Sequence, residues 1–114
     1  MRLLNQTKNT VVAEQVWLSR TFFQRIKGLL GRKTLNGQEA LVLIPCNSIH
    51  TFFMHFPIDV IFADKNNKVI GTLSDLKPNR ISRVYWSAVK VIELPAGSLK
   101  LTNTQNSDQL QFLN

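Results

Sequence analysis

The chain has 114 residues, a common length for one domain. Its composition, with 44% hydrophobic and 18% charged residues, is typical of a globular protein. A single cysteine, Cys46, excludes an intramolecular disulfide and any zinc site built from several thiolates. Fourteen basic residues against seven acidic ones give a net charge of +7, which suits an anionic partner. We therefore expect one basic, soluble domain over residues 1–114.

The sequence also predicts where the protein resides. Its first residues contain no apolar segment of the length that a signal peptide needs. The longest stretch without charged residues, 40–58, is interrupted by prolines and by polar side chains that are costly in hydrocarbon. We expect no membrane span and a cytoplasmic location.

The first predicted elements are two short strands at residues 3–7 and 11–16. A helix is predicted next, with Ser19 as its cap and Gly31 suited to its end. Its apolar stripe consists of residues with helical spacing, namely Phe22, Phe23, Ile26, Leu29 and Leu30.

The remainder of the chain is predicted to be mostly strands. Apolar runs bounded by turn residues predict strands at residues 40–44, 50–56, 58–63, 69–73, within 84–94, and at 109–113. One helix among six to eight strands predicts an α+β fold. We expect mostly antiparallel β-sheet or a partly closed barrel, with one amphipathic helix near the N-terminus.

Cys46, His50 and Met54 are spaced four residues apart and are the soft ligand types that copper(I) prefers. Residues eight apart in a strand span about 26 Å, so convergence on one ion would require a turn between them. Packing is the simpler interpretation of Met54 and Cys46. A Cys46–His50 nucleophile pair is conceivable, but no third member is evident. We expect no metal and no cofactor.

Asp59 and Glu93 each interrupt a run of apolar residues that reads as a buried strand. A carboxylate in such surroundings is costly unless it is paired or hydrogen-bonded. Two interpretations stay open, a structural clamp that ties loops to the sheet and an acid with a raised pKa in a pocket. The side chains that we consider as partners are His50, Thr51, Arg80 and Arg83.

Basic residues form two candidate patches. The first lies in a stretch without acidic residues and comprises Arg20, Arg25, Lys27, Arg32 and Lys33. It could meet phosphates or an anionic membrane surface, but the solvated surface of a basic protein is the simpler interpretation. The second, residues 80–86, mixes Arg80 and Arg83 with Tyr85 and Trp86 and could pair with phosphates and stack on bases. Val84 and Trp86 alternate as the inner face of a strand would, so we expect core packing there. Nucleic-acid binding is possible but not favoured.

Four segments resemble the family called domain of unknown function 192. They are residues 25–32 (RIKGLLGR), 45–54 (PCNSIHTFFM), 56–64 (FPIDVIFAD) and 93–97 (ELPAG). The resemblance implies a compact β-rich α+β domain, and it implies no activity because the family has no established biochemical role. It marks as special positions His50, Thr51, Met54, Asp59 and Glu93.

The chain departs from the family pattern at a few positions. His55 stands where the family often has arginine, Asn79 stands where tryptophan is frequent, and Ser107-Asp108 replaces a glycine-aspartate turn.

The leading hypothesis is a non-catalytic domain that binds an unknown small molecule or protein partner. Its site would lie around the candidate ligand residues His50, Thr51, Met54, Asp59 and Glu93. One alternative is a small hydrolase-type enzyme that uses Asp59 or Glu93 with His50 as general acid and base. A further alternative is nucleic-acid or anionic-surface binding through the basic patch of residues 20–33.

Overall fold

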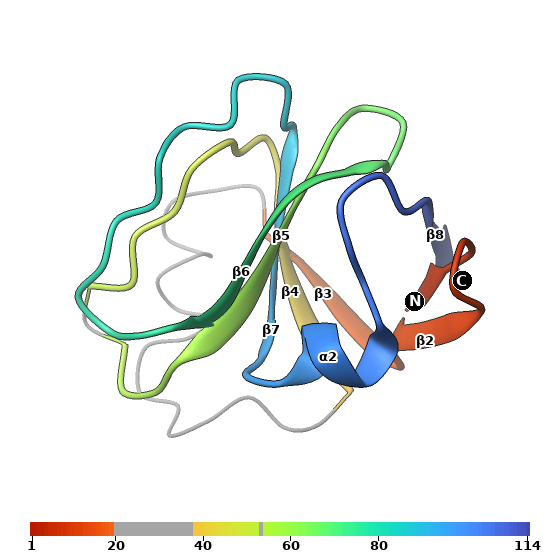
Figure 1. Cartoon of the computed structure of the whole chain (residues 1–114), viewed down its shortest axis with the longest axis horizontal. Coiled ribbons are helices and arrows are strands. Elements are labelled where there is room, and N and C mark those ends of the chain that lie inside the picture. Colours follow the sequence, from red (N-terminus) through yellow and green to blue (C-terminus); the bar gives the residue numbers. More distant parts are fainter. Residues whose placement is uncertain (20–37, 53) are drawn as a thin grey trace.

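The computed structural model describes residues 1–19, 38–52 and 54–114, which form two β-sheets and one short helix (Figure 1). The smaller sheet has the strand order β2 (Thr10–Ala13), β1 (Arg2–Asn5), β8 (Leu110–Leu113). The larger sheet has the order β3 (Gln15–Ser19), β4 (Glu39–Leu43), β7 (Lys90–Pro95), β5 (Ile58–Ala63), β6 (Val69–Leu76). The helix α2 (Ser98–Thr102) follows β7.

Pairing between distant parts of the chain determines the order of the strands. β1 pairs with β8, which places the two termini side by side in the smaller sheet (Figure 1). β7 pairs with both β4 and β5 in the larger sheet. β3 and β4 are parallel, and the other pairs are antiparallel.

Apolar side chains cover both faces of the larger sheet, and every residue of β5 is buried. One set, the inter-sheet core, contains residues of both sheets together with Leu99 of α2. A second set, the loop-side core, contains the alternate strand residues Ile58, Val60 and Phe62. Strand residues alternate between two faces, so β5 contributes to both cores.

Two long segments, residues 44–57 and 77–89, cover the loop-side core and are here called the paired loops. They run side by side (Figure 1), with an antiparallel bridge between His50 and Ile81. The backbone N–H of Thr51 donates to the carbonyl of Arg80 at 2.8 Å, and the N–H of Tyr85 donates to that of Asn47 at 2.8 Å. These bonds satisfy backbone groups that the sheet leaves without a strand partner.

The predicted fold class is wrong. The described strands form two sheets and no partly closed barrel, and the helix in the described part of the chain lies near the C-terminus. Strand order depends on pairs such as β1–β8, which local residue patterns do not encode. The helix α2 has only five residues, too few for an apolar stripe to be recognised. The helix predicted after Ser19 lies outside the described residues.

Several strand predictions are confirmed. Those at residues 40–44, 58–63 and 109–113 agree with β4, β5 and β8 to within one residue at each end. The strand predicted at residues 11–16 is instead split into β2 and β3 at Glu14. The described part of the predicted strand 50–56 holds only the single bridge at His50, because this segment belongs to a paired loop.

A buried polar cluster joins β1 to the segment before β8. The Asn5 amide donates to the carboxylate of Asp108 at 2.9 Å, the Gln105 N–H donates to the same oxygen at 2.9 Å, and Lys8 forms an ion pair with it at 3.0 Å. Burial alone raises the pKa of Asp108, but the bonds from Asn5, Gln105 and Lys8 outweigh it and lower the pKa overall. The fold therefore favours the ionised form.

We predict that Asp108→Asn destabilises the fold by about 1–3 kcal/mol near neutral pH. Because the pKa of Asp108 is lower in the folded state, its ionised form stabilises the fold at pH values above the pKa in the unfolded chain, which is about 4. This stabilisation is lost as the pH falls through the pKa of the folded state. The difference in unfolding free energy from wild type should therefore shrink in acid, as measured by urea titrations across pH. Asp75→Asn, which removes an exposed carboxylate paired with Lys77, is the control and should show little difference at any pH. A constant Asp108→Asn effect across pH would contradict the prediction.

Gly71 of β6 makes room for the ring of Tyr85, which belongs to a paired loop. Gly71 lies opposite Phe62, and the rings of Phe62 and Tyr85 stack with centroids 3.8 Å apart. A Cβ atom on Gly71 would lie 2.3 Å from Cε1 of Tyr85, closer than any van der Waals contact allows. The absence of a side chain at this position thus lets the loop pack onto the sheet.

We predict that Gly71→Ala lowers the unfolding free energy by about 1–3 kcal/mol, because the added methyl group must displace a buried ring. Ser74→Ala, on the exposed part of the same strand, should change it by less than about 0.5 kcal/mol. Urea denaturation of both variants measures the difference. Equal losses of unfolding free energy in the two variants would contradict the prediction, because they would show that the Tyr85 ring can move away from the added methyl group without destabilising the fold.

Candidate binding surface

Asp59 is fully buried in β5, and backbone groups satisfy its carboxylate. Its Oδ1 accepts a hydrogen bond from the N–H of Asp75 at 2.8 Å. Its Oδ2 accepts from the N–H groups of Gly97 at 3.1 Å and Leu99 at 2.9 Å. The carboxylate thus ties β5 to an irregularity in β6 and to the first turn of α2.

This geometry supports the clamp interpretation of Asp59. The side chains considered as partners from the sequence are not the ones used, because three backbone donors occupy the carboxylate. Asp75 lies in the bulge of the β5–β6 pairing and has a positive φ of 54°. The bulge directs the Asp75 N–H at the buried oxygen.

Thr51 is also fully buried, and it holds the paired loops together. Its hydroxyl donates to the carbonyl of Lys77 at 2.6 Å and accepts from the N–H of Arg80 at 2.9 Å. Its own carbonyl accepts from the N–H of Asn79 at 3.0 Å. Asn79 has a positive φ of 64°, so this turn is tight.

Glu93 lies on the opposite face of the larger sheet from Asp59. Its register partners in the neighbouring strands are Leu41 and Val60, both in the loop-side core. Asp59 shares its face with Ile61, which belongs to the inter-sheet core. The structure therefore does not bring the two carboxylates together.

Three further predicted residues lie in the first paired loop. His50 is exposed, and its ring lies 5.0 Å from that of Phe52. Met54 is half-buried against the loop-side core. The thiol of Cys46 donates to the carbonyl of Ser48 at 3.0 Å. Of the five candidate ligand residues, only His50 is in the exposed class.

The paired loops display large apolar side chains between basic ones. Ile81 is 70% exposed and Trp86 is 84% exposed, which contradicts the expected core packing of Trp86. Tyr85 is the ring that enters the core instead, because Gly71 leaves space for it. We give the name aromatic–basic strip to six of the exposed side chains of these loops, namely His50, Phe52, Arg80, Ile81, Arg83 and Trp86.

The aromatic–basic strip lies in segments that contain no acidic residue. All seven acidic residues of the chain fall outside 44–57 and 77–89, whereas Lys77, Arg80 and Arg83 fall within them. The exposed acid that precedes the second paired loop, Asp75, is paired with Lys77 at 2.9 Å. The guanidinium carbon of Arg83 lies 4.1 Å from the centroid of the Tyr85 ring.

The other basic residues of the predicted patches lie outside the described part of the chain, namely Arg20, Arg25, Lys27, Arg32 and Lys33.

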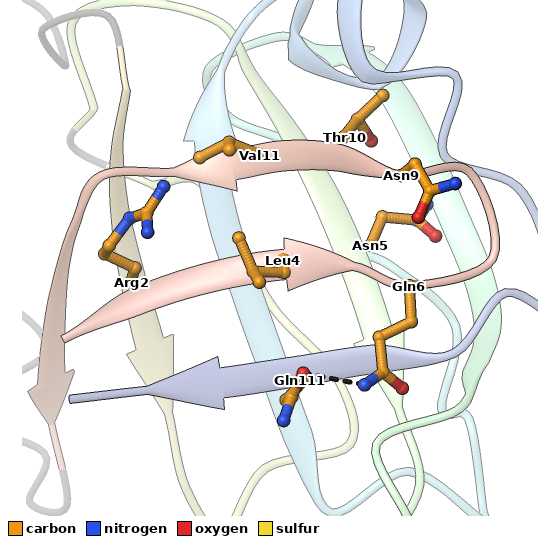
Figure 2. Close-up of a pocket in the computed structure, with 8 residues that line it drawn as sticks. All are labelled: Arg2, Leu4, Asn5, Gln6, Asn9, Thr10, Val11 and Gln111. Atoms are coloured by element: carbon orange, nitrogen blue, oxygen red, sulfur yellow. Dashed lines mark hydrogen bonds between the residues drawn. The ribbon is translucent and has the colours of Figure 1, made fainter.

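A shallow hollow of about 540 Å³ lies on the smaller sheet (Figure 2). Its lining includes one titratable side chain, Arg2, whose guanidinium is paired with Glu14 at 3.0 Å. Gln6 and Gln111 bond to each other at 2.6 Å across its edge (Figure 2). The hollow thus offers hydrogen-bonding groups but no pair of groups for acid–base chemistry.

The described residues contain neither a membrane-spanning helix nor a cluster of metal-binding side chains. No helix there is both long and apolar enough to cross a membrane. No three His, Cys, Asp or Glu side chains gather there as a metal ion would require.

The chain belongs to the family of domain of unknown function 192, described as Uncharacterized ACR, which it matches over residues 3–112. This confirms the resemblance in the sequence motifs. A UPF0127 protein of Thermococcus sibiricus is 38% identical over 119 residues, covering 96% of this chain and 73% of that protein. A UPF0127 protein of Pyrococcus horikoshii is 34% identical, covering 96% of this chain and 97% of that protein.

Solved structures share the fold. A protein of unknown function from Novosphingobium aromaticivorans aligns with a TM-score of 0.81 at 18% identity, covering 97% of this chain and 82% of that one. A second structure, from Sinorhizobium meliloti, aligns with a TM-score of 0.75 at 19% identity, covering 96% and 89%. At these identities the likeness concerns the arrangement of strands alone.

We predict that Asp59→Asn lowers the unfolding free energy by about 1.5–3 kcal/mol, because an amide NH₂ would face a backbone donor and the charge-assisted bonds would be lost. The matched control is Asp75→Asn, which removes a neighbouring exposed carboxylate but keeps the Asp75 N–H. Urea denaturation should show a change of less than about 0.5 kcal/mol for the control. A similarly small loss for Asp59→Asn would refute the clamp.

Proposed function

We propose that this protein is a non-catalytic binding domain and that the aromatic–basic strip recognises an anionic partner carrying planar or apolar groups. The observation that carries the proposal is the 84% exposure of Trp86 and 70% exposure of Ile81 beside two exposed arginines. Tryptophan and arginine are the residues that contribute most binding energy at interfaces. Their occurrence as exposed side chains in two adjacent loops favours a recognition role.

The aromatic–basic strip rests on a backbone that is already ordered. Thr51 is fully buried and bonds to both ends of the turn from Lys77 to Arg80. Tyr85 is held by Phe62, and Arg83 lies over the Tyr85 ring. A preorganised surface loses little conformational entropy on binding, which favours affinity.

The hydrolase alternative has less support. Asp59 is occupied by three backbone donors and lies on the face of the sheet away from Glu93. General acid–base catalysis needs its groups within reach of one substrate. In the binding proposal, Asp59 and Thr51 maintain the scaffold and His50 belongs to the recognition surface.

We predict that the double variant Arg80→Gln/Arg83→Gln elutes from immobilised heparin at lower salt than wild type. The matched control is Lys65→Gln/Lys100→Gln, which removes the same number of charges from exposed positions outside the paired loops. A partner site on the aromatic–basic strip predicts a larger shift for the arginine variant, since local charge density determines polyanion binding. Equal shifts would show that net charge alone acts and would contradict the proposed site.

A further inference from the structure

We propose that the ligand of the aromatic–basic strip is single-stranded nucleic acid, whose bases stack on Trp86 and on Phe52 with His50, and whose phosphates bond to Arg80 and Arg83. This inference rests on the proposed function and names its partner. Proteins that bind single strands combine stacking platforms with a basic track for the backbone. The order of side chains along the paired loops has both features.

The register of the paired loops orders the residues of the aromatic–basic strip along two adjacent backbone segments. Thr51 pairs with Arg80 at one end, and Asn47 pairs with Tyr85 at the other. Phe52 follows the first pair in the sequence and Trp86 follows the second, so an aromatic residue comes directly after each of the two pairs. The five residue steps from Arg80 to Tyr85 span about 16 Å of extended chain. That length accommodates a few consecutive nucleotides.

Two basic side chains of the second paired loop lie between these aromatic residues in the order of the paired backbone. Arg80 and Arg83 are exposed, and neither paired loop contains an acidic residue. Guanidinium groups bond to phosphate oxygens in a bidentate geometry and also stack on planar rings. The second paired loop therefore offers two exposed guanidinium groups to a phosphate backbone.

An acidic peptide is a poorer match than a nucleic acid. Extended peptides usually bind by adding a strand to free backbone groups. In the paired loops, the N–H groups of Thr51, Ser82 and Tyr85 already donate to the opposite loop. Side chains of an acidic peptide would satisfy the arginines but would leave the Trp86 indole without a planar partner.

The experiment measures binding of a fluorescently labelled oligouridine by anisotropy, with a duplex of the same length, polyglutamate and anionic phosphatidylserine vesicles as comparison probes. We expect the single strand to bind more tightly than the duplex. Trp86→Ala should weaken oligouridine binding about 5- to 100-fold through lost stacking. Leu101→Ala, which removes an apolar side chain that is 86% exposed in α2, should leave binding unchanged.

The salt dependence tests the phosphate contacts separately. Arg80→Gln and Arg83→Gln should each reduce the slope of log affinity against log salt by about 0.7, the contribution of one phosphate contact to a single strand. Lys65→Gln should leave the slope unchanged. In a Trp17→Phe background, Trp86 is the only tryptophan. Its fluorescence should then be quenched by oligouridine and not by polyglutamate.

The outcomes separate this inference from the proposed function. Polyglutamate or vesicles could bind more tightly than oligouridine and lose that binding in Trp86→Ala. This result would overturn the nucleic-acid inference but would still support the aromatic–basic strip as a recognition surface. Oligouridine binding that is unaffected by Trp86→Ala and by both arginine variants would overturn the inference. If, in addition, no probe responds to any strip variant, the proposed function fails as well.

Discussion

The buried carboxylate of Asp59 is the interaction on which the rest of this structure depends. It is fully buried in β5, where a carboxyl group is tolerated because three backbone N–H groups converge on it. Those groups belong to β6 and to the start of α2, so one side chain joins the sheet to the elements around it. Leu99 of α2 is thereby held in the inter-sheet core.

The two faces of the larger sheet have different roles. On one face, the smaller sheet and α2 close the inter-sheet core. There Asp59 bonds to the backbone of α2, and Asp108 bonds to Asn5 of the smaller sheet. On the other face, the paired loops close the loop-side core and turn their remaining side chains to solvent. The hydrogen-bonded carboxylates of Asp59 and Asp108 thus belong to the first face, and the paired loops on the second face contain no acidic residue.

The candidate site was only partly predictable from the sequence. Residues 40–44 and 58–63 could be recognised as strands because a run of apolar residues indicates burial on both faces. Asp59 could be recognised as unusual for the same reason. Its partners could not be identified, since backbone donors at Asp75, Gly97 and Leu99 have no residue signature. Likewise, the alternation of residues 84 and 86 predicted that Trp86 is buried. In the structure Tyr85 is the buried ring, because it packs against Gly71, which has no side chain.

The positive charge, the family and the position of most strands follow from composition and local residue pattern. The order of the strands, the separation of Asp59 from Glu93 and the exposure of Trp86 depend instead on the folded arrangement of the chain. Each of these depends on contacts between residues far apart in the chain. Such contacts form only where the shape of one segment fits another, as the Tyr85 ring fits over Gly71.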